Sequence, residues 1–450
     1  MRSELFKIPQ AVLDSSGDAV LHYGSPFAES RHFSEGRALV SRTDLAVLKL
    51  AGTDALKILH SQTTQKLDSL QPGQSAETLL LSPQGKIIAQ LAIVHAGDCI
   101  LITLLRAQAQ EIVDYFTRMR FTFDYQIADS SETLFCADIC APRAALKNIQ
   151  NCGALREADL ALCDADAALR EADLAGSVPI WGAIREFLSA NNSDITAIWC
   201  DPWVFADSAA QISYYRGGEH PAATGNGTVR LILDAKLLAE LVRGGVSNGL
   251  RLAGTYAVAA HEIALWRPSL ADFDERSLPH EYDLLRSSVH LNKGCYRGQE
   301  TVAKVHNLGH PPRRLVFLHL DGSDAILPVA GDKIFAAHPL GATKSAPELA
   351  ADLVRVEVSP ADAKTVHGGA EASPATERPI GIVTRAIMHY ELGAIGLGLV
   401  KRTAKTTDSY AIVTSSGATV RAAPTVIVPP DAGATQALDP LLRQQLLRRQ

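Results

Sequence analysis

The sequence predicts an α+β protein in which two mixed units are followed by a β-barrel or β-sandwich. Its 450 residues correspond to several domains, because a domain takes roughly 150 residues. Apolar runs with strand alternation are interleaved with helical periodicity from residue 46 to about residue 243. Beyond residue 310 the sequence consists of short apolar runs separated by Gly and Pro, which is typical of an all-β unit.

Composition excludes several classes of protein. Apolar residues make up 47% and charged residues 20%, as in a folded globular chain. The net charge of -6 disfavours a large phosphate-neutralising surface, so direct nucleic-acid binding is not expected. With no apolar run of about 20 residues and no secretory signal, we expect a cytoplasmic protein without membrane contact. The odd number of cysteines, seven, predicts reduced thiols rather than a disulfide framework.

The first α+β unit is expected to comprise residues 20–130 and 229–310. Gly52 to Asp54 supply turn and cap residues between a strand and a helix. Ser82 to Lys86 form a turn sequence between two apolar runs, which indicates a β-hairpin. The expected elements of the amino-terminal part are strands at 46–50, 77–81, 87–94 and 99–104, and helices at 55–62 and 107–118.

The second α+β unit is expected to be a smaller insertion at residues 131–228. It begins with a strand at 134–139, continues through an Ala-, Asp- and Glu-rich helical stretch, and leaves through a loop at 213–228. The chain then returns to the first unit through a strand at 231–233 and a helix at 235–243. Asp234 can cap this helix, and the pair Gly244–Gly245 is expected to end it.

The β-rich unit is expected at residues 311–425. Its predicted strands lie at 315–320, 332–335, 380–385 and 394–400, and a long Ala- and Pro-rich insertion at 337–377 interrupts it. The tail, 426–450, ends in leucines interspersed with arginines. This pattern fits a partner-binding amphipathic helix or a frayed basic end.

Residues 292–300 combine a thiol, two cations and two glycines in nine positions. Lys293 and Arg297 would favour the thiolate form of Cys295 and lower its pKa. Gly294 and Gly298 allow the backbone to curl around a ligand. Gln299 and Glu300 offer donors and acceptors for an amide-like heterocycle edge. The alternative is that Cys295 is a buried filler in a tight turn before a strand at 301–305.

The motif Lys-Gly-Cys-Tyr-Arg-Gly-Gln-Glu at 293–300 resembles the signature of the YgfZ-type folate-binding proteins, which are relatives of the glycine-cleavage T protein. The resemblance extends to residues 41–104, 272–281 and 303–315. It implies a T-protein-like folate-binding fold, with two α+β subdomains and a C-terminal β-barrel around a central pocket. It also implies that the cysteine motif lies near that pocket.

The resemblance further implies what the site residues do. Cys295 and Lys293 are the expected catalytic residues, and no metal site is expected. A tetrahydrofolate or another folate is the expected cofactor, and iron–sulfur client or assembly proteins are the expected partners. The family is associated with iron–sulfur cluster assembly or repair and with modification of thiolated tRNA, so any tRNA involvement would be indirect. The expected folate contacts are Tyr296, Arg297, Gly298, Gln299 and Glu300.

The sequence also departs from the T proteins. Ala89 and Gln90 stand where T proteins carry a catalytic aspartate, and neither side chain can act as a general base. A second departure is Glu262, which stands in a segment where relatives often carry an arginine. Enzymatic activity is therefore left open. The alternatives are a folate-dependent aminomethyltransferase or related one-carbon transferase that uses Glu281 or Asp283, and a scaffold without folate or chemistry.

Three weaker sequence features can be interpreted as either structural or functional: a cysteine pair, two histidines and an aromatic cluster. Cys136 and Cys140 do not have the spacing of a common zinc site and are expected to be strand fillers. His306 and His310 are either proton partners of Cys295 or surface-loop residues. An aromatic cluster is either a stacking platform or part of the core, and it comprises Trp199, Trp203, Tyr214 and Tyr215.

Overall fold

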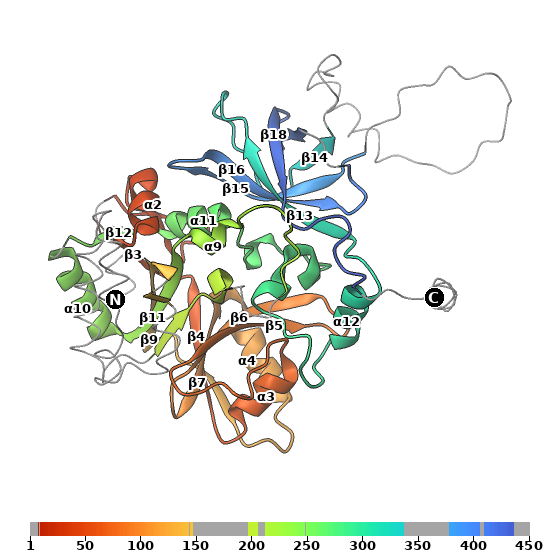
Figure 1. The fold of residues 1–450 in the computed structure, drawn as a ribbon. Coiled ribbons are helices and arrows are strands. Elements are labelled where there is room, and N and C mark those ends of the chain that lie inside the picture. The colour runs from red at the N-terminus through yellow and green to blue at the C-terminus, as the bar shows by residue number, and fades with distance from the viewer. Residues whose placement is uncertain are drawn as a thin grey trace, which may run out of the picture.

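A computed structural model describes the protein at residues 8, 10–143, 145–146, 197–205, 212–247, 249–336, 378–405 and 409–435. Three expected segments lie outside these residues: the helical stretch of the proposed insertion, the Ala- and Pro-rich insertion at 337–377, and the Leu- and Arg-rich end of the tail. Figure 1 shows the described elements as a group of two sheets with a barrel above them.

The first sheet is antiparallel, with strand order β5-β6-β7-β4-β8. Its strands are β4 (Leu45–Ala51), β5 (Ser75–Leu81), β6 (Ile87–His95), β7 (Cys99–Leu105) and β8 (Gln126–Asp129). Helices α3 (Ala55–Gln62) and α4 (Ala109–Arg118) pack against it through apolar side chains at helical spacing, such as Ile58, Leu59, Ile112 and Phe116. These elements confirm the predicted hairpin and both predicted helices.

The second sheet has the order β10-β11-β9-β3-β12. It joins β9 (Leu134–Ala141), β10 (Ala197–Cys200) and β11 (Gly227–Asp234) to β3 (Ala38–Ser41) and β12 (Arg251–Ala253). The strands of the proposed insertion therefore share one sheet with strands from the first unit. The second sheet is therefore defined by pairing between strands that are far apart in the sequence, which the local hydrophobic pattern does not reveal.

Helices cover the second sheet and lead to the barrel. They are α2 (Pro26–Ser34), α9 (Pro221–Thr224), α10 (Ala235–Ser247) and α11 (Thr255–Ala264). A small hairpin of β1 (Val12–Leu13) and β2 (Val20–His22) precedes them. The described part of this region also contains the 3-10 helices η3 (Pro202–Phe205), η4 (Leu270–Asp272), η5 (Pro279–Tyr282) and η6 (Leu284–Arg286). Another 3-10 turn, η1 (Arg106–Gln108), precedes α4.

The β-rich unit is a closed barrel, which decides between the two predicted architectures. Its strand order is β13-β16-β15-β14-β17-β18. The strands are β13 (Arg313–Leu320), β14 (Lys333–Ala336), β15 (Gly381–His389), β16 (Gly393–Lys401), β17 (Tyr410–Val413) and β18 (Thr419–Val426). A register shift between Val383 and Arg385 marks a β-bulge in β15, and such bulges re-aim neighbouring side chains.

Two local predictions were wrong. The helix predicted to end at Gly244–Gly245 continues to Ser247, because a glycine weakens a helix by only about 1 kcal/mol relative to alanine. The strand predicted at 301–305 is part of helix α12 (Gln299–Asn307). Val302 and His306, four residues apart, are its buried residues, so the segment has helical rather than alternating periodicity.

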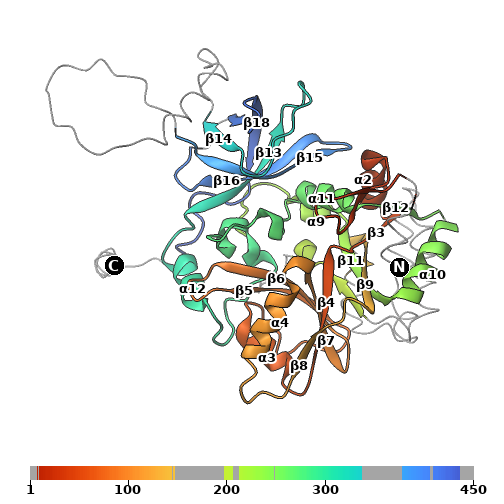
Figure 2. The same cartoon turned by 180° about the vertical axis from the view of Figure 1, so that it is seen from behind.

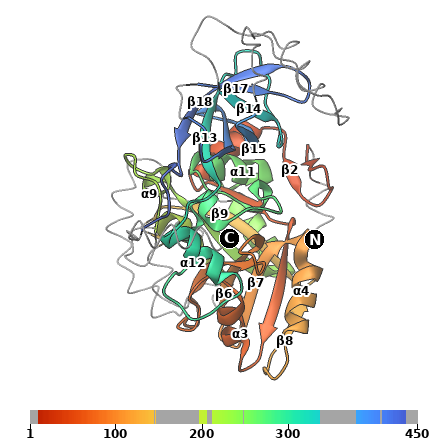
Figure 3. The same ribbon diagram turned by 90° about the vertical axis from the view of Figure 1, so that its right-hand side faces the viewer.

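The two sheets and the barrel meet at the centre of the molecule, as Figures 2 and 3 show from other sides. After β18 the chain returns to α12, where the Thr435 amide donates to the His306 carbonyl. Gly433 lies so close to α12 that a Cβ there would stand 2.6 Å from the Val305 oxygen. The first part of the expected tail is thus packed against the motif helix. None of the helices in the described ranges has the length and apolarity to cross a bilayer.

Candidate functional site

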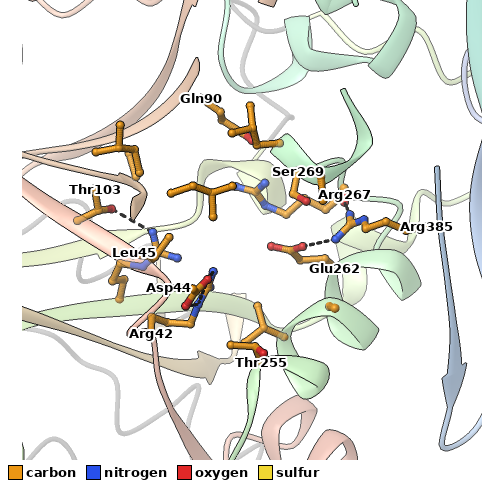
Figure 4. Close-up of a pocket in the computed structure, with 18 of the residues that line it drawn as sticks. Arg42, Asp44, Leu45, Gln90, Thr103, Thr255, Glu262, Arg267, Ser269 and Arg385 are labelled. Carbon is orange, nitrogen blue, oxygen red and sulfur yellow. Dashed lines mark hydrogen bonds and ion pairs between the residues drawn. The ribbon is translucent and has the colours of Figure 1, made fainter. Parts of the chain in front are cut away.

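A cavity of about 320 Å³ lies where the two sheets, α11 and the barrel meet. Its volume is at the lower end of the range for small-molecule pockets, which is about 300–1,000 Å³. Apolar residues such as Leu45 and Trp199 form part of its wall, and charged and uncharged polar residues form the rest (Figure 4). The charged lining residues are Arg42, Asp44, Glu77, Arg230, Glu262, Arg267 and Arg385. The central pocket expected from the motif resemblance is therefore present.

Arg42 and Arg230 share one buried carboxylate. Arg230 makes a two-pronged contact with Asp138, with Nε–Oδ1 and Nη2–Oδ2 distances of 2.8 and 2.9 Å. Arg42 donates to the same carboxylate at 2.6 Å and to Asp44 at 2.7 Å. Burial opposes ionisation of Asp138, but the two guanidinium groups hold its pKa below the ordinary value. Both arginines are thereby fixed in orientation.

Arg267 bridges two buried carboxylates on different elements. Its Nε and Nη2 atoms donate to Asp201 at 2.6 and 3.0 Å, and Nη2 also donates to Glu77 at 2.6 Å. Burial raises the pKa of Asp201 above its ordinary value despite this partner. The pKa of Glu77 is lowered, because Arg267 and the Ser288 hydroxyl outweigh its burial. Burial thus dominates the pKa of Asp201, whereas the hydrogen-bonding partners dominate the pKa of Glu77.

The barrel contributes Arg385, which follows the bulge in β15. Its Nη1 atom donates to Glu262 of α11 at 2.7 Å, and its guanidinium also contacts Asp272 of η4 at 2.8 Å. Figure 4 shows the Glu262 carboxylate in the middle of the cavity with the Arg385 guanidinium beside it. This ion pair joins the barrel to the α+β part at the wall of the cavity.

Unused hydrogen-bonding capacity remains on two lining residues. In the described part of the chain, the Glu262 carboxylate accepts one side-chain hydrogen bond, at Oε2, and its side chain is 18% exposed. Gln90 keeps a buried amide nitrogen, Nε2, without a well-formed hydrogen bond among the described residues, although its amide contributes to the lowered pKa of Glu77. A ligand with adjacent donors and one acceptor would complement these groups.

The charges around the cavity favour a ligand rich in hydrogen-bond donors. Every guanidinium nitrogen of the four arginines already donates to a protein oxygen. Against the four guanidinium groups stand six carboxylates, of which Asp44, Glu77 and Glu262 line the cavity. The other three, Asp138, Asp201 and Asp272, are ion-paired partners behind the wall. The cavity is therefore rich in acceptors.

The cysteine motif occupies another part of the molecule, at the turn of the β5–β6 hairpin. None of residues 292–300, all of which are described, lines the cavity. Gly298, with φ of 83°, lies against this turn, and a Cβ on it would stand 2.7 Å from the Ser82 oxygen. Glu77, in strand β5 at the cavity, is five residues from Ser82 at the turn, a span of about 17 Å at ~3.4 Å per residue. The motif and the cavity are thus at opposite ends of one strand.

Lys293 holds the motif loop to the end of α3. Its Nζ atom donates to the main-chain oxygens of His60, Thr63 and Gln65, the last two at 2.6 and 2.8 Å. It also lies 5.1 Å from the centroid of the Tyr296 ring. Burial lowers the pKa of Lys293 to about 8. The Lys293 hydrogen bonds seen among the described residues go to these carbonyls, not to the thiol.

The other motif side chains anchor the loop as well. Arg297 stacks on the Tyr115 ring of α4, with 5.5 Å between the guanidinium carbon and the centroid. The Gln299 amide donates to the Lys293 carbonyl at 3.4 Å. Tyr296 is buried, and Glu300 is exposed in the first turn of α12. Cys295 is exposed within this anchored loop, which rules out the buried-filler interpretation.

The structure places the other candidate residues away from the cavity. Glu281 is ion-paired with Arg313 at 2.8 Å, and Asp283 accepts from the Tyr214 amide and the Ser213 hydroxyl. Nδ1 of His306 pairs with the Tyr214 hydroxyl, and Nδ1 of His310 pairs with the Ala432 carbonyl.

The weaker sequence signals mostly belong to the core. Cys136 and Cys140 are buried in β9, and burial raises the pKa of Cys136 to about 12. The described ranges hold no cluster of His, Cys, Asp and Glu suited to a metal ion. Trp203 and Tyr214 are core residues, whereas Trp199 lines the cavity and lies 5.1 Å from the Arg230 guanidinium.

Sequence reasoning named Glu262 but missed the other charged residues of the cavity wall. Its members had a signal, because a charged residue interrupts each of several apolar runs. Glu77 lies in Ser-Ala-Glu-Thr-Leu, Asp138 in Cys-Ala-Asp-Ile-Cys and Arg230 in Thr-Val-Arg-Leu-Ile. A charge inside a buried strand needs a partner or a function.

Comparisons with known proteins agree with this architecture. No protein-family model matches the chain. A chloroplastic protein of Arabidopsis thaliana that is named a candidate transferase is 24% identical over 304 residues, which covers 64% of this chain. The chain spans 57% of the length of that relative. The crystal structure of the glycine cleavage system aminomethyltransferase T from Bartonella henselae matches with a TM-score of 0.60 and 14% identity, over 97% of this chain and 98% of that one. The chain therefore has the fold of the glycine cleavage T protein.

Proposed function

We propose that the protein binds a reduced folate in its central cavity and presents the Cys295 thiol, on a separate face, to support the assembly or repair of iron–sulfur proteins. The observation that carries the proposal is an acceptor-rich cavity at the centre of a T-protein fold. Its position, its volume and its unused hydrogen-bonding groups all favour a small donor-rich heterocycle.

The residues around the cavity fit the pterin head of a folate. The pterin carries an amino group next to a ring N–H, and both are donors that a carboxylate such as Glu262 can accept. Gln90 Nε2 would donate to the ring carbonyl. The reduced pterin has further ring N–H groups, so the three lining carboxylates Asp44, Glu77 and Glu262 favour a tetrahydrofolate over an oxidised folate. A bound tetrahydrofolate would supply nitrogen atoms that carry one-carbon units.

Two residues of β6 favour folate binding without transfer of an aminomethyl group. Ala89 and Gln90 both lie on β6, and Gln90 lines the cavity at a point where an ionisable group would be needed. An amide cannot take a proton from an attacking amine. The protein would thus use the T-protein scaffold as a folate receptor.

The exposure of Cys295 supports the second part of the proposal. The loop around the thiol is anchored by Lys293 and Arg297, and the cysteine itself faces outward, where a partner protein can reach it. One cysteine cannot hold a cluster alone, so contact with a cluster requires ligands from a client or an assembly protein. Any role in tRNA modification would then follow from the iron–sulfur enzyme that is supported.

A one-carbon transferase is the second candidate function. The name of the Arabidopsis relative and the fold of the chain favour it. Glu281 and Asp283 do not line the cavity, so a transferase that acts in this cavity would use another acid or base. Glu262 is the lining carboxylate with an oxygen available to a substrate. Turnover of an aminomethyl-lipoyl protein that requires tetrahydrofolate and is lost in Glu262→Gln would establish this function.

Calorimetry with tetrahydrofolate under reducing conditions tests the first proposal. We expect saturable binding at micromolar concentrations and a loss of about tenfold or more in Glu262→Gln, since a hydrogen bond to a charged group contributes about 1.5–3 kcal/mol. Glu132→Gln, on the exposed turn before β9, is the matched control and should bind like the wild type. Absence of binding in the wild type would refute the folate assignment.

The thiol assignment has a separate test in cells. Replacement of the chromosomal gene by Cys295→Ser should lower the activity of iron–sulfur enzymes, while enzymes without clusters keep theirs. The purified Cys295→Ser protein should unfold at the temperature of the wild type, because the side chain is exposed. Unchanged iron–sulfur enzyme activity in these cells would remove the thiol from the proposal.

A further inference from the structure

The cysteine loop and the segment at Ser287 and Ser288 both hydrogen-bond to the three residues Thr63 to Gln65. On one side, Lys293 Nζ donates to the Thr63 and Gln65 carbonyls. On the other side, Thr64 Oγ1 donates to the Ser288 carbonyl at 2.6 Å, and Gln65 Nε2 donates to the Ser287 carbonyl at 2.8 Å. This short segment is thus held between the loop and the chain that precedes it.

Ser287 and Ser288 are in turn hydrogen-bonded to the wall of the cavity. The hydroxyl groups of Ser287 and Ser288 donate to Glu77 Oε1 at 3.2 and 2.5 Å. The other oxygen of Glu77 accepts from Arg267 at 2.6 Å. Ser287, Ser288, Glu77 and Arg267 are all buried, and the last two line the cavity. A continuous path of hydrogen bonds therefore leads from Glu77 in the cavity wall, through Ser288 and Thr64, to Lys293. Where two successive hydrogen bonds do not share an atom, one residue or one peptide bond joins them.

We infer that Lys293 is a positioning residue that couples the Cys295 loop to the cavity, so that a ligand bound in the cavity, against the wall at Glu77 and Arg267, changes the reactivity of the thiol. This inference rests on the proposed function, because it assigns the folate a regulatory role toward the thiol. It replaces the expectation that Lys293 acts on the thiol directly, since the contacts of its amine are with main-chain carbonyls.

The physical basis is the stiffness of buried polar networks. A buried donor or acceptor that loses its partner costs about 1–3 kcal/mol, so the members of such a chain keep their positions together. A ligand that fixes Glu77 and Arg267 restricts Ser287 and Ser288, and through Thr64 and Gln65 it restricts the loop. We expect the thiol to react more slowly when the cavity is filled, because the loop samples fewer conformations.

The test measures alkylation of Cys295 by iodoacetamide, with and without saturating tetrahydrofolate. Cys152 and Cys163 are replaced by Ser, and the modified residue is identified by peptide mass spectrometry. The expected result is a rate constant about fivefold lower with ligand, the smaller end of typical coupling between sites. The rate is followed across pH, so that an effect on thiol position is separated from an effect on thiol pKa.

Variants locate the connection. In Lys293→Met the ligand should no longer alter the rate, Lys293→Arg should restore the effect in part, and the exposed Lys304→Met on α12 should behave as the wild type. Ser288→Ala removes the hydrogen bond to Glu77 and should also abolish the effect of the ligand on the alkylation rate. Ser30 is a buried serine on α2, and Ser30→Ala should leave this effect unchanged. The Ser288 variant keeps the test valid if Lys293→Met does not fold.

The outcomes separate the inference from the proposed function. If tetrahydrofolate binds and the rate is the same with and without it, the coupling is refuted and the folate assignment stands. If the rate changes equally in the wild type and Lys293→Met, Lys293 is not the connection and the inference fails. If tetrahydrofolate does not bind, the proposed function fails and the inference fails with it.

Discussion

Arg385 of the barrel and Glu262 of α11 form an ion pair of 2.7 Å across the cavity, although 123 positions separate them in the sequence. Arg385 follows the bulge in β15, and Asp272 holds its guanidinium from a third element. One arginine thus joins the barrel to the α+β part at the proposed ligand site.

Removal of this arginine should loosen the barrel. In Arg385→Ala the buried Asp272 loses its cationic partner, so we expect the free energy of unfolding to fall by about 3–5 kcal/mol. Urea denaturation measures the change. Arg421→Ala, on the exposed side of β18, is the control and should stay within about 0.5 kcal/mol of the wild type. Equal stability of the two variants would contradict the assigned role.

Asp283 should make stability depend on pH in an unusual direction. Burial raises its pKa to about 6, so between the ordinary value near ~4 and pH ~6 the folded state binds the proton more tightly than the unfolded state. The stabilisation that Asp283 gives to the folded state by binding this proton is therefore fully present below pH ~4. It is lost as the pH rises through ~6.

The variant Asp283→Asn isolates this effect. Relative to wild type, the variant should gain about 2 kcal/mol of stability between pH 4.5 and pH 7.5, because asparagine does not titrate. Urea denaturation at both pH values checks it, with the exposed Asp324→Asn as the control. The same pH dependence in wild type and Asp283→Asn would show that Asp283 does not titrate in this range.

Cys295 should be the thiol that reacts first among the described cysteines. The others, Cys99, Cys136, Cys140 and Cys200, are buried, and burial raises the pKa of each thiol. Brief treatment with N-ethylmaleimide at pH 7.5 should label Cys295 in the folded protein and label those four after unfolding in urea. Peptide mass spectrometry gives the sites, and early labelling of Cys136 or Cys140 would contradict the fold around them.

The two glycines of the motif should differ in their tolerance of alanine. Gly298→Ala places a Cβ at positive φ and 2.7 Å from the Ser82 oxygen, so we expect a loss of about 1–3 kcal/mol. Gly294→Ala meets nothing within 4 Å and should change stability little. Thermal unfolding of both proteins makes the comparison. A larger loss in Gly294→Ala than in Gly298→Ala would show that the loop is not packed on the hairpin as described.

Local pattern was enough for most elements of the fold. Helix α3 has the predicted bounds, and strands β5, β6 and β7 lie where alternation and turn residues put them, because apolar periodicity and turn chemistry act over a few residues. The motif at 293–300 could be recognised for the same reason. Where packing overrides local preference the predictions were wrong, as in the helix at 299–307 and in the continuation of α10 past two glycines.

The sequence by itself determined the α+β and β-rich units, the hairpin before the motif and the motif itself. Only the tertiary structure decided that the β-rich unit is a closed barrel, that strands of the two α+β units share a sheet, and that the motif lies away from the cavity. It also paired Arg267 with Glu77 across 190 positions. The physical reason is that strand pairing and buried ion pairs depend on contacts between segments that are distant in the sequence. Local periodicity carries no information about those contacts.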